Sequence, residues 1–237
     1  MAASAKKTNA PKLSSRQIKD VLYEQVARIG KATSSPKRLE LLELLCQGEM
    51  NVEQLAAEAQ ISIKLASAHL SVLKSASMVE TRRAGKNIFY SLTATDVAQF
   101  WVAIRSLAEE RLLELQVALN RLVKGEGSLA PFDRAALLRD AASGDIVVID
   151  VRPESEFAAG HIPYARSIPL TELKKRIAEL PQDKDIVAYC RGPFCLFANE
   201  AVNMLKNAGL SAKRIDDGVA EWKSHGFEVT YQQSDNC

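Results

Sequence analysis

The sequence predicts two domains, a mainly helical domain followed by an α/β domain with a parallel sheet. The first half carries apolar residues at helical spacing and, after them, two strand-like runs around a basic turn. The second half alternates strand-like and helical segments, the pattern of a parallel sheet covered by helices. Residues 1–127 carry 18 Lys and Arg against 13 Asp and Glu, whereas residues 128–237 carry 13 against 16. A basic first domain suggests a polyanionic partner.

The composition is that of an ordinary soluble protein. Of the 237 residues, 47% are hydrophobic and 25% are charged, and no apolar run approaches the length that crosses a membrane. The polar, basic start lacks the apolar core of a signal peptide, and four cysteines are too few for a disulfide framework. We therefore expect a cytoplasmic protein that binds no membrane, with a disordered basic arm over residues 1–14 and a tail over residues 232–237.

Four helices are expected before the basic turn. Serines cap the first, over about residues 16–31, and a Ser-Pro step starts the second. A capping box at residues 51–54 starts a short third helix, and another serine caps the fourth, over residues 63–75. Two short helices joined by a tight turn predict a helix-turn-helix. The residues that the fourth helix should bury are Leu65, Ala66, Leu70 and Leu73.

The fourth helix and the basic turn form a predicted DNA-binding surface. The outward face of this helix carries Ile63, Lys64, Ser67, Ala68 and Ser71. Two strands are predicted at residues 79–83 and 87–92, and the cations around the tip between them are Arg82, Arg83 and Lys86. Serine hydroxyls bond bases or phosphates, and the cations suit phosphate. The alternative is a solvated basic turn without a partner.

The order of these elements resembles the ArsR family of winged-helix repressors. The matching segments are residues 35–39, 62–74, 78–79 and 82–92. The resemblance implies a winged helix-turn-helix that binds double-stranded DNA as a homodimer, at a palindromic operator. The family usually has glycine where Ser77 stands, so we expect slight strain at this helix end.

The metal sites of that family have no counterpart in this sequence. Many members bind soft metals through a cysteine pair on the first helix of the helix-turn-helix, but residues 49–54 contain no cysteine. A second family site uses histidine and carboxylate ligands on the last helix, and residues 93–123 contain no histidine. We therefore expect no metal and no cofactor, and we assign Cys46, on a leucine-rich helix, to the core.

One long helix is predicted over residues 95–123. It carries more apolar side chains than one small domain can cover, so a partner helix from a second copy is expected. These side chains are Val97, Phe100, Trp101, Ile104, Leu107, Leu112, Leu115, Leu119 and Leu122. The first domain then spans residues 15–124, and a short linker follows at residues 125–128.

The second domain, over residues 129–231, places a cysteine at the end of a strand. The predicted strands are residues 146–150, 167–168, 186–189 and 212–215, and the predicted helices are residues 154–159, 171–180 and 196–208. Cys190 follows the third strand and precedes the third helix, at the sheet edge where such folds keep their sites. The helix N-terminus should lower the pKa of this thiol and make it a nucleophile. The alternative is a buried apolar filler.

The residues around Cys190 resemble the rhodanese family of sulfurtransferases. Four segments of the signature occur in the family's order. They are D-V-R at residues 150–152, E-F at 156–157, G-H-I-P at 160–163 and D-G-V-A-E-W at 217–222. The resemblance implies that Cys190 takes sulfur from thiosulfate, a persulfide or a polysulfide, and passes it to a thiol or cyanide. Backbone amides of the active loop should hold the Cys190 persulfide, and the loop side chains are Arg191, Gly192, Pro193, Phe194 and Leu196.

Other residues of the signature are expected to build the frame of the site. They are Asp150, Arg152, Glu156 and His161, with an Arg152–Glu156 ion pair that joins the first strand to the next helix. Arg191 is expected either to attract an anionic donor or to point to solvent. Phosphatases and arsenate reductases of similar fold need an arginine six residues after the cysteine, where this chain has Leu196, so neither activity is expected.

Three roles are open for Cys195. It could resolve a Cys190 persulfide or sulfenic acid into a disulfide, hold arsenite together with Cys190, or only fill the loop. The sequence favours a homodimeric DNA-binding transcriptional regulator whose rhodanese domain senses or processes reactive sulfur. The alternatives are a sulfurtransferase that uses the winged helix as a dimer scaffold, a regulator that senses arsenite or oxidants, and a catalytically inactive interaction module.

Overall fold

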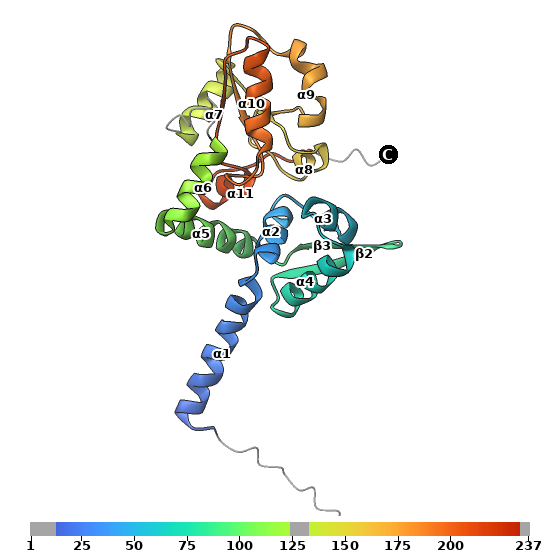
Figure 1. The fold of residues 1–237 in the computed structure, drawn as a ribbon, viewed down its shortest axis with the longest axis vertical. Helices are drawn as coiled ribbons and strands as arrows, with labels where there is room; N and C mark the ends of the chain where they lie inside the picture. Colours follow the sequence, from blue (N-terminus) through green and yellow to red (C-terminus); the bar gives the residue numbers. More distant parts are fainter. Residues whose placement is uncertain (1–12, 124–132, 233–237) are drawn as a thin grey trace, which may run out of the picture.

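The computed structural model describes residues 13–123 and 133–232, which form two domains. Figure 1 shows the helical domain below and the α/β domain above, with α1 (Ser15–Thr33) projecting away from both. The predicted linker lies outside the described residues, and so do the predicted arm and tail except for residues 13, 14 and 232. None of the described helices is long and apolar enough to cross a membrane.

The helices of the first domain begin where the sequence predicts them. They are α1, α2 (Pro36–Leu45), α3 (Val52–Glu58) and α4 (Ile63–Ser75). Capping boxes close the first turns of α1 and α3, and the Ser62 hydroxyl accepts a hydrogen bond from the Leu65 amide at 3.3 Å. These caps confirm the predicted starts, because each satisfies backbone N–H groups that have no partner within the helix.

The buried face of α4 differs from the prediction at one position. Ala66, Leu70 and Leu73 are fully buried, but Leu65 is 43% exposed, so its assignment to the core is wrong. The small Ala66 side chain lets α4 approach the core, and Leu65 then falls at the edge of the contact. After the helix, Ser77 has a φ of +58°, the left-handed conformation expected where relatives carry glycine, and a side chain there costs roughly 1 kcal/mol.

The predicted hairpin is present as a wing. β2 (Val79–Ala84) pairs antiparallel with β3 (Asn87–Leu92), and the turn between them is Gly85-Lys86. A two-residue strand that the sequence did not reveal, β1 (Met50–Asn51), pairs with the other edge of β3. The wing is therefore joined to the start of α3 by a sheet.

The predicted long helix is broken into two. α5 (Thr95–Arg111) ends at Leu112, whose backbone is extended, and α6 (Leu113–Val123) starts again in a new direction. The Gln116 side chain donates a hydrogen bond at 2.8 Å to the carbonyl of Glu109, which the break deprives of its helical partner. A single continuous helix was therefore a wrong prediction, and its apolar spacing could not show the break.

The second domain contains a four-stranded parallel sheet in the order β5-β4-β6-β7. The strands are β4 (Ile146–Asp150), β5 (Arg166–Ser167), β6 (Asp185–Tyr189) and β7 (Ala212–Arg214). The helices are α7 (Arg134–Ser143), α8 (Glu154–Ala159), α9 (Leu170–Arg176), α10 (Phe197–Asn207) and α11 (Val219–Ser224), with a 3-10 turn at Ile177–Glu179. The parallel sheet of the predicted α/β class is confirmed, whereas α7 and α11 were not predicted.

Helices cover both faces of this sheet. Alternate residues of β4 point to opposite sides, so Val147 and Ile149 pack with α9 and α10, and Val148 packs with α7 and α11. Trp222 of α11 is completely buried on the second side. This layering leaves the carboxyl edge of the strands free for loops, and that edge faces the first domain (Figure 1).

The two domains meet where α11 lies against α5. Trp101 and Val102 of α5 are buried there with Ala220 of α11. Arg105 of α5 forms an ion pair with Glu221 of α11 at 2.7 Å, and the two side chains are only 4% and 5% exposed. Part of the apolar surplus that the sequence assigned to a second copy is therefore covered by the chain's own second domain.

Candidate thiol site and nucleic-acid interface

Cys190 lies at the carboxyl end of β6, at the start of the loop that leads into α10. It is 2% exposed, and its Sγ lies 3.4 Å from the carbonyl oxygen of Cys195. β6 lies between β4 and β7 in the sheet, so the thiol sits centrally on the sheet edge. This is the position predicted for the nucleophile.

Cys190 and Cys195 are both reduced, and their thiols share a hydrogen bond. Burial raises the pKa of Cys190 well above its ordinary value, and its hydrogen bond to Cys195 adds to that rise. The same hydrogen bond lowers the pKa of Cys195 to about 7, helped by the backbone amides of Arg191 and Phe197. The shift of the Cys190 pKa is thus opposite to the predicted one in this closed state, and Cys195 is the more acidic of the two thiols.

The signature residues form a buried frame, but with partners other than those predicted. Arg152 and Asp150 are each fully buried and pair at 2.5 Å, and Arg152 also donates to the Gly160 carbonyl at 2.8 Å. The predicted Arg152–Glu156 pair does not form, because Asp150 lies two residues away on the same strand end. His161 is 7% exposed, stacks on Phe157 with 3.7 Å between ring centroids and contacts the Phe157 carbonyl through Nδ1 at 2.9 Å.

Arg191 does not point to solvent, so that expectation for it is wrong. It is 8% exposed and held between two carboxylates from different domains. Its Nη2 pairs with Glu156 of α8 at 2.5 Å, and its Nη1 pairs with Glu58 of α3 at 2.7 Å. The first residue after Cys190 is thereby tied to the first helix of the helix-turn-helix.

Gln47, from the turn after α2, joins the same contact. Its Oε1 accepts a hydrogen bond from Arg152 Nη1 at 2.9 Å, and its Nε2 approaches the Arg191 carbonyl at 3.5 Å. Gln47 is 3% exposed, so both of its polar ends are used within the protein. Sequence reasoning missed Gln47 and Glu58, because neither belongs to a motif and only the packing of the domains brings them to the loop.

The far side of the active loop packs on α5. The Phe194 ring lies edge-on to Trp101, with 6.3 Å between their centroids, and the Arg105 guanidinium lies 5.8 Å from the Phe194 ring. Gly192 has a φ of +144°, and a side chain there would stand 3.2 Å from Glu221 and 3.3 Å from Arg105. Pro193 also borders a cavity next to α5, and Leu196 is 45% exposed. First-domain residues therefore flank this loop on two sides.

Gly218 allows the loop to pass close to α11. A Cβ built at this position would stand 2.4 Å from the Arg191 carbonyl oxygen and 2.8 Å from that of Cys190. We expect Gly218→Ala to displace the active loop and to lower the free energy of unfolding by about 3 kcal/mol in chemical denaturation. The matched control is Gly30→Ala in α1, where a Cβ meets nothing within 4 Å and should stabilise the helix slightly. Equal stability of the two variants would contradict this packing.

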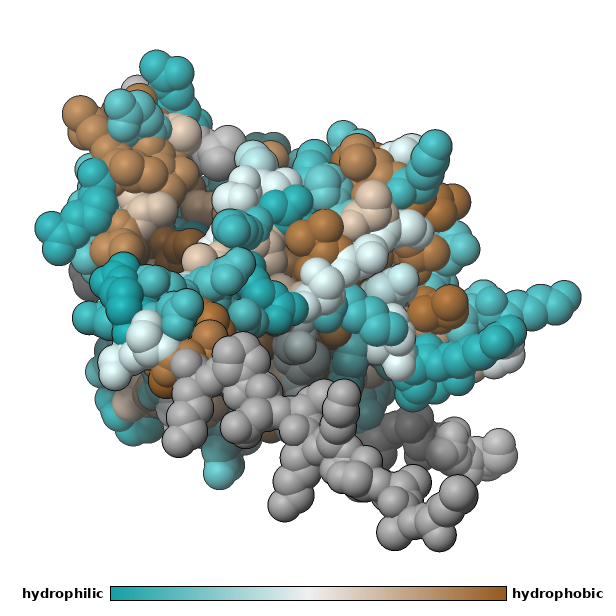
Figure 2. Space-filling model, turned by 90° about the horizontal axis from the view of Figure 1, so that it is seen from below, coloured by the Kyte–Doolittle hydropathy of each residue, from teal (hydrophilic) through white to brown (hydrophobic). Residues whose placement is uncertain are grey.

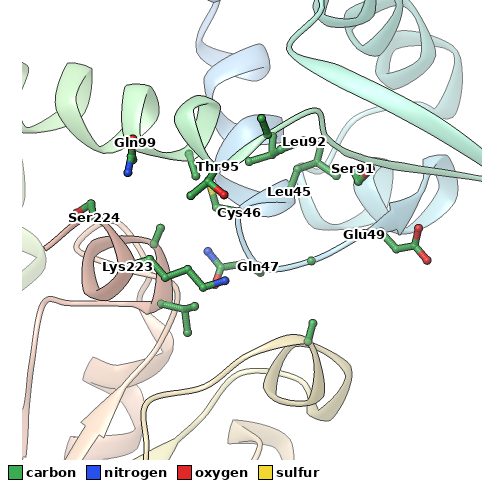
Figure 3. Close-up of a pocket in the computed structure, with 16 residues that line it drawn as sticks. Leu45, Cys46, Gln47, Glu49, Ser91, Leu92, Thr95, Gln99, Lys223 and Ser224 are labelled. Carbon is green, nitrogen blue, oxygen red and sulfur yellow. The ribbon is translucent and has the colours of Figure 1, made fainter. Parts of the chain in front are cut away.

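A cavity of about 310 Å³ separates the domains beside these contacts. Figure 3 shows Cys46 and Thr95 on its first-domain side, and Lys223 reaching across from α11 toward Gln47. Cys46 packs with Trp101 and Ala220, and burial raises its pKa, which disfavours the reactive thiolate form. Its assignment to the core agrees with the packing.

Glu43 of α2 is a second buried group at this junction. One of its carboxylate oxygens is buried without a hydrogen-bond partner. Burial raises the pKa of Glu43 from 4.5 to about 7, although Arg105 opposes the shift, and the nearby Cys195 and Glu221 add to it. Glu43, whose carboxyl group keeps its proton up to about pH 7, thus lies near the ion pair of Arg105 and Glu221 between the domains.

The predicted nucleic-acid surface is exposed. Lys64, Ser67, Ala68 and Ser71 lie on the outer face of α4, and Ile63 is 51% exposed at its start. Arg83 and Lys86 are exposed near the tip of the wing, which stands out as a hydrophilic projection at the right of Figure 2. Arg82 is exposed too, but it pairs with Glu49 and lies 5.3 Å from the Phe89 ring, so it points along the wing.

Comparisons with known proteins agree with this division of the chain. Residues 35–81 match the family model described as a bacterial regulatory protein of the arsR family, and residues 133–225 match that of the rhodanese-like domain. The chain is similar to the HTH-type transcriptional regulator Rv0324 of Mycobacterium tuberculosis, with 43% identity over 212 residues, or 89% of this chain and 92% of the relative. It is also similar to a sulfurtransferase of Allochromatium vinosum, with 31% identity over 38% of this chain and 84% of the relative.

One solved structure is similar to the first domain. It is the homodimeric winged helix-turn-helix DNA-binding domain of Mb0332 from Mycobacterium bovis, with 39% identity, a TM-score of 0.40, and coverage of 44% of this chain and 95% of that one. The fold and the site define a winged-helix regulator joined to a rhodanese-like domain. This chain belongs to the arsR family of bacterial regulatory proteins and carries its rhodanese-like domain after the winged helix.

Proposed function

We propose that this protein is a homodimeric transcriptional regulator that binds a palindromic DNA duplex and responds to reactive sulfur through Cys190 and Cys195. The observation that carries the proposal is the ion pair of Arg191 with Glu58, which joins the loop of the thiol pair to the helix-turn-helix at 2.7 Å. Chemistry at the thiols therefore has a direct route to the DNA-binding helices.

The sulfur chemistry needs two steps. The Cys190 thiol passes its proton to the hydrogen-bonded Cys195 thiolate and attacks the outer sulfur of a donor such as thiosulfate; a Cys190–sulfur bond forms, the donor's S–S bond breaks, and sulfite leaves with the electron pair. The Cys195 thiolate, favoured by its pKa of about 7, then attacks Cys190 Sγ of the persulfide. This forms a Cys190–Cys195 disulfide and releases hydrosulfide, so no separate oxidant is needed.

The dimer is supported by the apolar face of α1. Five large side chains of this helix are 45–70% exposed: Ile18, Val21, Leu22, Tyr23 and Val26. A helix with such a face that projects from its own domain needs a partner, and a second copy provides the same face in two-fold symmetry. Two recognition helices related in this way read the two halves of a palindrome.

The wing should contribute to the affinity for any duplex. We expect Arg83→Ala with Lys86→Ala to weaken DNA binding about tenfold for all sequences alike, and to reduce its dependence on salt, because phosphate contacts release counterions. Titration of labelled duplexes at two salt concentrations measures both effects. Arg82→Ala is the matched control and should have a smaller effect, since Glu49 already pairs with Arg82. Unchanged binding of the double variant would contradict the role of the wing.

Persulfidation should mark Cys190. After treatment with a persulfide donor, we expect mass spectrometry to find one added sulfur on Cys190 in Cys195→Ser, and a Cys190–Cys195 disulfide in the wild type. Cys46 should stay unmodified, because burial raises its pKa. The opposite result would be added sulfur on Cys195 in the variant Cys190→Ser and no added sulfur on Cys190 in Cys195→Ser. It would mean that Cys195 accepts the sulfur and Cys190 resolves the persulfide.

A further inference from the structure

We call the contact of α3 and α5 with the active loop the docked arrangement. In this arrangement the active loop is closed. Cys190 is 2% exposed, so its Sγ is almost entirely shielded from solvent. The Arg191 guanidinium is fixed between Glu156 and Glu58, and the Arg191 carbonyl lies 3.5 Å from Gln47. Side chain and backbone of this residue are thus both held by the first domain.

We propose that Gln47 and Glu58 of the winged-helix domain are positioning residues of the thiol site, which keep the loop closed over Cys190 until the two domains part. The inference rests on the proposed function of Cys190. Gln47 acts through the Arg191 backbone and through Arg152, which it contacts at 2.9 Å. Glu58 acts through the Arg191 side chain. The thiol site is thus built from both domains, although the rhodanese-like domain carries the whole catalytic signature.

The contact between the domains is suited to opening. It combines ion pairs with a small apolar cluster around Trp101, Val102 and Ala220. Cavities of about 310, 420 and 480 Å³, each lined by residues of both domains, flank it. Junctions between domains that are this polar separate more readily than a continuous core. The Glu58 side chain is 35% exposed, so water and salt reach its pair with Arg191.

Alkylation of Cys190 in the full chain measures the opening. Labelling of Cys190 by iodoacetamide, followed by mass spectrometry, should be about fivefold faster in Glu58→Gln than in the wild type. A fivefold change corresponds to the upper range of the free energy that a partly exposed ion pair contributes. The matched control is Glu53→Gln, an exposed glutamate on the same helix, which should label like the wild type. Gln47→Met, which keeps the volume and removes the side-chain contacts with Arg152, with the Arg191 carbonyl and with the Glu43 carbonyl, should also label faster.

Salt provides a readout that a purely structural role would not change. Labelling of the wild type should accelerate as salt rises toward 0.5 M, because salt screens the Glu58–Arg191 pair, whereas labelling of Glu58→Gln should stay constant. Equal rates in the wild type and Glu58→Gln, or the same gain in Glu53→Gln, would overturn the inference. Alkylation needs no sulfur donor, so a Glu58 effect without any persulfide on Cys190 would refute the sulfur chemistry alone.

Discussion

A persulfide donor should weaken the binding of this protein to its operator about tenfold, and a thiol reductant should restore it. In the proposed switch, a Cys190–Cys195 disulfide would reshape the loop that carries Arg191, and Arg191 would lose its ion pair with Glu58. Without this partner, α3 would no longer hold the helix-turn-helix in the arrangement that the docked loop supports. A coupling of this size, about 1.4 kcal/mol, is within the usual range for two linked sites. Titrations of a palindromic duplex, selected by the protein from random sequences, measure it before and after the donor.

Two variants test the route of this effect. Cys195→Ser should still accept sulfur on Cys190 but keep its operator affinity in the presence of donor, because no disulfide forms. Cys190→Ser should show neither change. If the wild type and both variants bind the duplex equally with and without donor, there is no switch. The protein would then be better described as a sulfurtransferase carried on a DNA-binding dimer.

Replacement of Glu43 by glutamine should stabilise the protein at pH 8 by up to about 3 kcal/mol. The pKa of Glu43 is raised from 4.5 to about 7 in the folded chain. The folded state therefore holds a proton between these values that the unfolded state has lost, and the stability of the wild type falls as pH rises from 4.5 to 7. Above pH 7 the loss is complete, and Glu43→Gln avoids it because its side chain stays neutral.

Chemical denaturation at pH 5 and pH 8 distinguishes this effect from others. The gain of Glu43→Gln should be small at pH 5 and large at pH 8. Cys195 is a second titrating group at the junction, but its lowered pKa adds stability between pH 7 and 9, and it is common to both proteins. Glu40→Gln on the same helix is the matched control, because Glu40 is 39% exposed and pairs with Lys37. A gain that is equal at both pH values would contradict the assignment.

Local signals predicted most of the fold. The starts of α1, α3 and α4 were found because each cap lies within four residues of the groups that it satisfies. The bounds of β4 and α8 were predicted to the residue, since a buried parallel strand and the turn after it both have strong composition signals. The break at Leu112 was missed because apolar spacing is nearly the same on both sides of it.

The candidate site was predicted in its position and not in its contacts. The signature placed Cys190, Asp150 and Arg152 at one sheet edge, which follows from strand order alone. The partners of Arg191 and the pKa order of the two thiols depend on α3 and α5, which come from sequence 80 or more residues away. No periodicity or motif reports how two domains dock, so Glu58, Gln47 and Glu43 could not be recognised.

The ion pair between Arg191 and Glu58 has a consequence for how many copies of the protein respond. Linkage between two sites is reciprocal, so if the disulfide lowers operator affinity, a bound operator must disfavour formation of the disulfide at equilibrium by the same factor. Copies off the DNA are then consumed by the donor first, while those on the operator are protected. The donor concentration at which transcription changes would therefore rise with the concentration of the protein, because the copies that are free of DNA react with the donor before those on the operator.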